Sequence, residues 1–183
     1  MILFRRSTEK TLLMPQNLNQ KFYENNDDII AHGCAVCSAG NVAAYYNKRK
    51  YTINQLKDIG VFSSTSAVCI WSNTPNTGFH DYTGKNFLTK IKSEINLGHP
   101  VIVHCMNSAS NEHYVVAFAY KNSASTLADI IVLDSAGSAI SVFGKMRSLK
   151  DSMKYNNELT YIKRLKLTYY KPPVLNHIQK LFR

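Results

Sequence analysis

The amino-acid sequence predicts an α+β fold, with helices in the first part of the chain and an antiparallel sheet in the second. Two observations support this prediction. Apolar residues follow helical spacing up to Gly98, and short runs of β-branched and aromatic residues, bounded by Asn, Ser, Gly or Pro, follow after it. The 183 residues, 45% of them hydrophobic, predict a single domain over residues 1–183 and exclude a disordered chain.

Two helices are predicted before Gly60. Residues 1–13 are expected to be a basic lead-in without a partner, and residues 14–33 an extended segment or loop. The small residues between 35 and 46 predict a helix that is buried and packs closely against a neighbouring element. Thr52 and Gln55 have the spacing of a capping box, which would open a short helix that ends at Gly60.

The remaining elements are predicted from the change in period after Gly98. Residues 61–84 are expected to form a long loop anchored by Trp71 and Phe79, and residues 86–97 a second full helix. Strands joined as hairpins or a meander, and so mostly antiparallel, should follow. They are expected at residues 101–103, 114–120, 129–133 and 139–143. A helix at 145–155, a strand at 159–170 and a basic amphipathic tail at 174–183 complete the prediction.

Positive charge is concentrated near the C-terminal end of the sequence. The formal net charge is +10, of which residues 144–183, with ten basic and two acidic residues, contribute +8. We therefore expect a nearly neutral core over residues 14–143 and a basic flank over 144–183 that could meet an anionic partner, such as anionic lipid or a bacterial wall. Nucleic acid is a less favoured partner because the charge is not spread over the domain. Alternatively, residues 174–183 pack as a final helix with solvated lysines.

Cysteine use and hydropathy restrict the class of protein. One close pair is present, Cys34 and Cys37, and a zinc site would also need Cys69, Cys105 or scattered histidines, so we expect no metal and no organic cofactor. No apolar run has the length of a membrane helix, and the start of the sequence lacks a secretory signal pattern. We expect a soluble protein, cytoplasmic at synthesis, with delivery or release from the cell left open.

Three separated residues have the placement that nucleophilic catalysis by cysteine needs. Cys34 directly precedes the predicted buried helix, whose positive end would favour a thiolate. His113 opens a predicted strand after a polar loop, and Asp134 closes the next strand, where its carboxylate could hold the histidine ring. The alternatives are a small apolar filler role for Cys34, a core role for His113, and a redox pair of Cys34 with Cys37. A redox pair of the thioredoxin-like kind is disfavoured because the preceding segment is polar and acidic rather than strand-like, and no βαβ unit surrounds it.

Five segments in order resemble the C39-like cysteine peptidases, a branch of the papain-like fold. The resemblance covers roughly residues 14–143 and is carried by a Gly-Cys helix, a Thr-x-x-Gln-Leu helix start, a Gly-x-Pro-Val-Ile-Val strand, a His-Tyr-Val-Val strand and an Ile-Val-Leu-Asp strand. These segments are residues 32–46, 52–56, 95–103, 113–120 and 131–134. Three positions depart from the family pattern: Ala35-Val36 replaces Gly-Pro, Glu112 stands where Gly is common, and Ser135 replaces Pro.

The resemblance implies a papain-like cysteine hydrolase. Cys34 would be the nucleophile, His113 the acid and base, and Asp134 the residue that orients it. Gln20 is the best match for the family's oxyanion-binding Gln, with Gln16 and Asn19 as rivals. The expected reaction is cleavage of a peptide or isopeptide bond through a thioester, on a peptide, protein or peptidoglycan-peptide substrate. A bacterial or phage effector, toxin or lysin would fit this activity. Acyl transfer and deamidation are alternative reactions that use the same catalytic residues. The alternatives are a catalytically idle papain-like binding module and a nucleic-acid binder that uses the basic flank.

Overall fold

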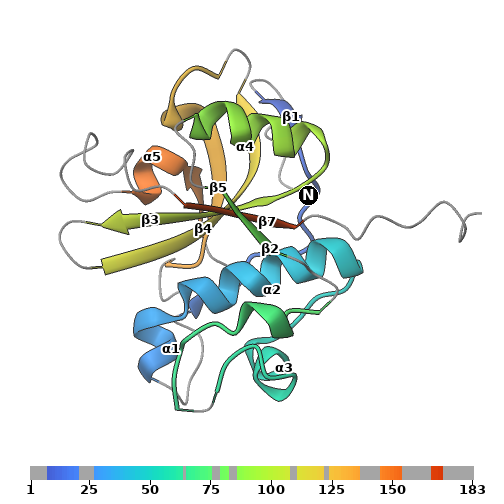
Figure 1. Cartoon of the computed structure of the whole chain (residues 1–183), viewed down its shortest axis with the longest axis vertical. Helices are drawn as coiled ribbons and strands as arrows, with labels where there is room; N and C mark the ends of the chain where they lie inside the picture. The colour runs from blue at the N-terminus through green and yellow to red at the C-terminus, as the bar shows by residue number, and fades with distance from the viewer. Residues whose placement is uncertain are drawn as a thin grey trace, which may run out of the picture.

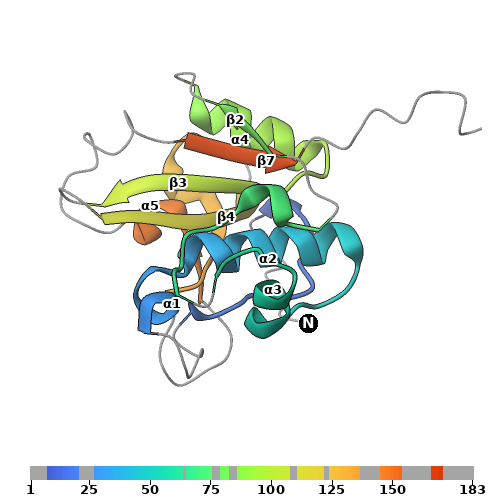
Figure 2. The same ribbon diagram turned by 60° about the horizontal axis from the view of Figure 1, so that its bottom comes forward.

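An antiparallel sheet with helices on two sides forms the computed structural model (Figure 1), which confirms the predicted α+β class. The structure describes residues 8–20, 27–63, 65–75, 79–82, 86–107, 111–121, 124–136, 145–153 and 166–170. Helices α1, α2 and α3 lie on one side of the sheet and α4 on the other, as both views show (Figures 1 and 2).

The sheet contains the predicted meander and extends beyond it. The strands are β1 (Thr8–Thr11), β2 (Phe79–Tyr82), β3 (Val101–Asn107), β4 (Asn111–Lys121), β5 (Ile130–Asp134), β6 (Lys145–Ser148) and β7 (Lys166–Tyr170). Their order is β2-β7-β3-β4-β5-β6, and β1 also pairs with β4. Strands predicted at 101–103, 114–120 and 129–133 are confirmed. β3 and β4 are longer than predicted because their polar ends pair with each other, as Cys105 does with His113.

Four short elements differ from the prediction. β1 lies in the supposed lead-in and pairs with Ala119, Tyr120 and Lys121, at the end of β4 that β3 does not reach. Helix α1 (Asp27–His32) lies in the predicted loop at 14–33, and β2, in the predicted loop at 61–84, pairs with β7. Strand pairing with β5 overrides the helix predicted from residue 145, so α5 (Leu149–Ser152) begins only after Ser148, whose side chain caps it.

The predicted helices are confirmed with small changes in their ends. α2 (Cys34–Asn47) is buried through its first eleven residues, and a Cβ on Gly40 would come within 2.5 Å of Leu56 Cδ1, so close packing requires the small residue. α3 (Ile53–Asp58) has the predicted capping box between Thr52 and Gln55. α4 (Phe87–Asn96) buries one face. The segments predicted as a strand at 139–143 and a tail at 174–183 lie outside the described residues.

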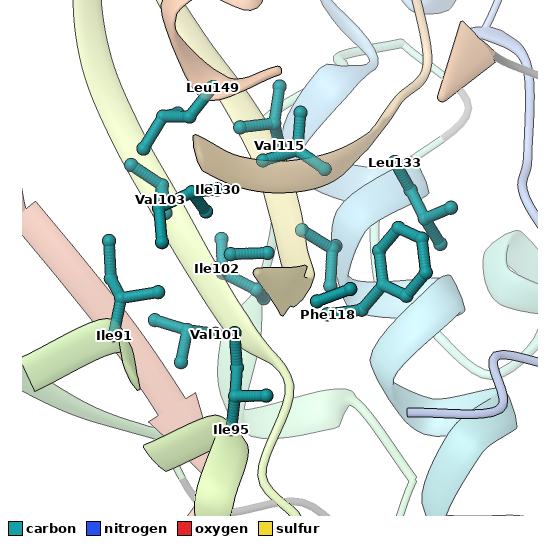
Figure 3. Close-up of a cluster of buried hydrophobic side chains, with 14 of the residues drawn as sticks. Ile91, Ile95, Val101, Ile102, Val103, Val115, Phe118, Ile130, Leu133 and Leu149 are labelled. Atoms are coloured by element: carbon teal, nitrogen blue, oxygen red, sulfur yellow. The ribbon is translucent and has the colours of Figure 1, made fainter. Parts of the chain in front are cut away.

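Two hydrophobic clusters form the core, and α2 contributes to both. In the larger cluster, Ile91 and Ile95 of α4 lie against Val101 of β3 (Figure 3). The smaller cluster joins α2 to α3 and the segment after it, and contains Val36 and Leu56. Short 3₁₀ turns at Trp71–Asn73 and Leu127–Asp129 complete the described secondary structure. Among the described residues, no helix has both the length and the apolar character needed to cross a bilayer.

Candidate active site

Cys34 is the first residue of α2, and its side chain is only 6% exposed. The free N–H groups at a helix start carry partial positive charge and favour an anion there. The preceding Gly33 has to be small, because a Cβ at that position would come within 2.5 Å of the Ile29 carbonyl oxygen. This tight turn from α1 into α2 fixes the position of the thiol, whose Sγ lies 3.8 Å from the His32 carbonyl oxygen.

His113 and Asp134 lie on neighbouring strands and contact each other. His113 Nε2 is 3.0 Å from Asp134 Oδ1. The carboxylate is 1% exposed and also accepts a hydrogen bond from the Ala136 N–H at 2.9 Å. Arg147 Nε lies 3.4 Å from its other oxygen. His113 also forms a side-chain hydrogen bond with Cys34, for which the ring nitrogen not used by Asp134, Nδ1, is available.

The charges of the site hold His113 protonated at neutral pH. Burial alone would lower the pKa of His113, but the hydrogen bonds and charges of Asp134 and Cys34 outweigh it and raise that pKa to about 9. Burial would raise the pKa of Asp134, but the hydrogen bond and charge of His113, together with Arg147, lower it. An ionised carboxylate and a protonated ring beside a thiol are the groups that thiol catalysis uses.

The three candidates for the oxyanion residue have different surroundings. Both ends of the Gln16 amide are occupied away from Cys34, by the Gly40 carbonyl of α2 at 3.1 Å and by the N–H of Tyr51, which follows α2, at 2.8 Å. Asn19 is buried. Gln20 Nε2 donates to the Ile30 carbonyl at 3.1 Å, and its Oε1 accepts from the Ser135 hydroxyl at 2.8 Å. Gln20 therefore connects the segment that leads to Cys34 with the residue that follows Asp134.

The other three cysteines lie close enough to Cys34 for its charge to act on them. The pKa of each is raised, first by burial and then by the charge of Cys34, and reaches about 12 for Cys69 and Cys105. Cys105 Sγ donates to the His113 carbonyl oxygen at 3.5 Å. All four cysteines are free thiols. Within the described parts of the chain, no group of three or more His, Cys, Asp or Glu residues is arranged to hold a metal ion.

Sequence reasoning missed two residues of the site. The sequence predicts a helix at residues 145–155, whereas Arg147 lies on β6 opposite Val132, on the diagonal from Asp134. No local pattern indicates this contact, because it depends on the β5–β6 register. Ser135 was noted only as a departure from the family pattern. That departure was the available signal, since a hydroxyl at this position can bond to Gln20 and proline cannot.

The chain matches a known protein family. A family model described as Peptidase_C39 like family matches residues 13–163. The matched region contains Gln20, Cys34, His113 and Asp134, and it extends past the predicted core at 14–143 to include β6 and α5. No curated protein matches the chain.

Proposed function

The chain belongs to the Peptidase_C39 like family, which assigns it at a coarse level to the cysteine peptidases, and from this premise we propose a papain-like hydrolase of peptide or isopeptide bonds. The observation that carries the proposal is the chain of hydrogen bonds from Cys34 through His113 to Asp134. The proposal treats the chain as one domain, since β6, α5 and β7 of the basic flank belong to the same sheet and its packing.

The proposed reaction has two steps. The Cys34 thiolate attacks the carbonyl carbon of the substrate, and His113 gives its proton to the leaving amine as the C–N bond breaks. The resulting thioester is then attacked by water, with His113 as the base, which releases the acid and restores the thiol. Asp134 stays ionised throughout, holds the ring by its Nε2–H, and stabilises the positive charge of the imidazolium.

Two N–H groups are proposed to bind the oxyanion that forms in each step. The backbone N–H of Cys34, at the start of α2, belongs to the first turn, where N–H groups have no partner within the helix. The Gln20 amide is the second donor. Its Oε1 is fixed by Ser135, so its nitrogen points toward the segment before Cys34, where it donates to the Ile30 carbonyl at 3.1 Å and to the Ala31 carbonyl at 3.4 Å. The longer of these two bonds would have to be exchanged for the oxyanion. Such donors commonly supply the largest share of catalysis.

A peptidase acts on peptides or proteins, and this substrate class is the coarse assignment for the chain. A peptidoglycan peptide, an effector or toxin target, and an isopeptide bond are finer proposals within that class. The basic flank is proposed to help recruit an anionic target. Because β6 and β7 come from this flank and belong to the sheet, the flank has a structural role that does not depend on what its charges bind.

Selective alkylation tests the proposal. At neutral pH, iodoacetamide should label Cys34 much faster than Cys37 or Cys105, because only Cys34 is paired with a protonated histidine. Tryptic mapping by mass spectrometry identifies the labelled thiol. Cys34→Ala should abolish the fast label, and His113→Ala should slow it.

A second measurement separates the hydrolase from an idle binding module. A peptide-library cleavage assay should give activity that Cys34→Ala removes completely. Equal labelling rates for the buried cysteines would contradict the proposed site. Fast Cys34 labelling together with peptide binding and no cleavage under any condition would favour the binding module.

A further inference from the structure

Cys37 stands one helical turn after Cys34 on α2, and the proposed reaction makes no use of it. Its side chain is fully buried, and its N–H donates to the Gly33 carbonyl oxygen at 2.9 Å, so a regular turn of helix joins the two cysteines. Because residues three apart share a helix face, the two thiols point to the same side of α2. The charge of Cys34 acts directly on the thiol of Cys37, which agrees with this placement.

Helix geometry brings the pair close to the spacing of a disulfide. Cα atoms three residues apart on an α-helix are about 5 Å from each other, inside the range of about 4.4–6.8 Å found for disulfides. Their Cβ atoms are about 5–6 Å apart, whereas a disulfide has about 3.5–4.5 Å. The first turn of α2 must therefore close by roughly 1–2 Å. A disulfide formed in this way is strained, and strained disulfides are the ones most readily reduced again.

The two thiols have different environments, which suit Cys34 to react with the oxidant and Cys37 to form the disulfide afterwards. Cys34 stands at the first position of α2 and is hydrogen-bonded to His113, a placement typical of cysteines that react with oxidants. Burial in the α2–α3 cluster raises the pKa of Cys37, so this thiol stays protonated and does not compete for the oxidant. The Cys37 thiol also lies within hydrogen-bonding reach of the Ser135 side chain, whose own hydrogen is given to Gln20.

We propose that Cys34 and Cys37 form a reversible disulfide on exposure to a hydroperoxide, and that this bond switches the candidate nucleophile off. In the first step the Cys34 thiolate attacks a peroxide oxygen. An S–O bond forms, the O–O bond breaks, and hydroxide or alkoxide leaves. In the second, Cys37 sulfur attacks Cys34 sulfur. The S–S bond forms, the S–O bond breaks, and the departing hydroxide takes the Cys37 proton as water. Two electrons pass from the two sulfurs to the peroxide.

Low-molecular-weight thiols, as the reductant, would reverse the change by two thiol–disulfide exchanges. The oxidised form would protect Cys34 from irreversible oxidation and keep it from attacking substrate. The loss of hydrolysis rests on the proposed function, whereas the formation of the disulfide does not.

Cys37 is a better partner than the other two thiols. Cys105 lies on β3, and its thiol donates a hydrogen bond to the His113 carbonyl oxygen. Cys69 lies in the segment between α3 and the Trp71 turn, which belongs to a different element from Cys34, so no helix geometry fixes the spacing of these two thiols. Only Cys37 is held at a fixed spacing from Cys34 by one continuous helix turn.

The experiment treats the reduced full-length protein with one equivalent of hydrogen peroxide, blocks the remaining thiols with N-ethylmaleimide, and maps the tryptic peptides. Trypsin leaves Cys34 and Cys37 together on the peptide 22–48, while Cys69 and Cys105 are on separate peptides, 58–85 and 93–121. We expect the peptide 22–48 to lose two hydrogens and both labels, and dithiothreitol to restore both. Cys37→Ala should instead trap Cys34 as a sulfenic acid that dimedone labels, and further peroxide should oxidise it irreversibly.

Cys69→Ser is the matched control and should behave as the parent does. Because Cys37 is in the core, Cys37→Ser is tested beside Cys37→Ala, and a melting curve checks that each variant is folded. A cross-linked pair of peptides that joins Cys34 to Cys69, or equal dimedone labelling of the parent and Cys37→Ala, would overturn the proposal. A disulfide between Cys34 and Cys37 in a protein that cleaves no peptide would leave the redox pair standing and contradict the hydrolase.

Discussion

Replacing Asp134 by Asn keeps the shape of the side chain and removes its negative charge. In the native protein the pKa of His113 is about 9 rather than the ordinary 6.5, and Asp134 is the largest contributor that raises it. That difference corresponds to about 3 kcal/mol in favour of the protonated ring. In the variant, burial still lowers the pKa of His113, and of the two groups that raise this pKa only Cys34 remains. We therefore expect His113 to titrate near or below 6.5 and to be mostly neutral at pH 7.

The same change should alter the dependence of stability on pH. Because the folded-state pKa of His113 is raised, its contribution is fully present below 6.5 and is lost as pH rises through about 9. Because the pKa of Asp134 is lowered, its contribution is present above 3.8 and is lost as pH falls through its folded-state pKa. The parent should therefore exceed Asp134→Asn in unfolding free energy most strongly between about pH 4 and 6.5.

Two measurements test this reasoning. An NMR titration of the histidine rings, assigned with a His113→Gln variant, gives the pKa of His113 in the parent and in Asp134→Asn. Urea unfolding at pH 5.5 and pH 9 gives the stability difference. Glu94→Gln is a matched control, because it removes the other buried carboxylate that holds a histidine, His99, at 2.8 Å. A His113 that still titrates near 9 without the Asp134 charge would refute the reasoning, and so would a stability difference that does not change with pH.

Two further substitutions test the supports of the site. Ser135→Ala removes the hydroxyl that donates a hydrogen bond to Gln20 Oε1. It should lower the unfolding free energy by about 1–3 kcal/mol and lower kcat, while the rate of Cys34 alkylation stays unchanged. An alkylation rate that falls in parallel with kcat would show that Ser135 acts on the thiol rather than on the oxyanion donor. Gly33→Ala places a Cβ against the Ile29 carbonyl, and since the φ of −73° suits any residue, contact alone should cost about 1–3 kcal/mol. Thermal denaturation should show a lower Tm, and an unchanged Tm would mean that the turn relaxes freely.

The sequence was informative where a local pattern has one physical explanation. The small residues of α2 predicted a buried helix because close packing excludes larger ones, and the Thr52–Gln55 spacing predicted a capping box that the structure confirms. β1 and β2 were missed because nothing in either segment reads as a strand by itself. Both become strands only by pairing with partners far away in the chain, at Ala119–Lys121 and Lys166–Tyr170.

In the candidate site, too, some features follow from local sequence patterns and others depend on contacts between distant residues. The order of Cys34, His113 and Asp134 along the chain was sufficient to predict that they meet, because each follows or precedes a recognisable element. Their chemical roles remain predictions. The choice between Gln16 and Gln20 could not be made from the sequence, since both are glutamines in one polar segment. It depends on where the hydrogen-bond partners lie, because Gln16 bonds to Gly40 and Tyr51, whereas Gln20 bonds to the segment just before Cys34.

The position of β7 between β2 and β3 has a consequence for how the protein is made. β7 is synthesised about 60 residues after β3 ends, so at ribosomal rates of about 5–20 residues per second, roughly 3–12 s pass before it is available. During that interval the outer edge of β3 lacks its partner, and an open strand edge invites aggregation. Nascent chains released before residue 166 should therefore sediment as aggregates, and the hairpin that carries His113 should become a stable part of the sheet only after β7 has been synthesised.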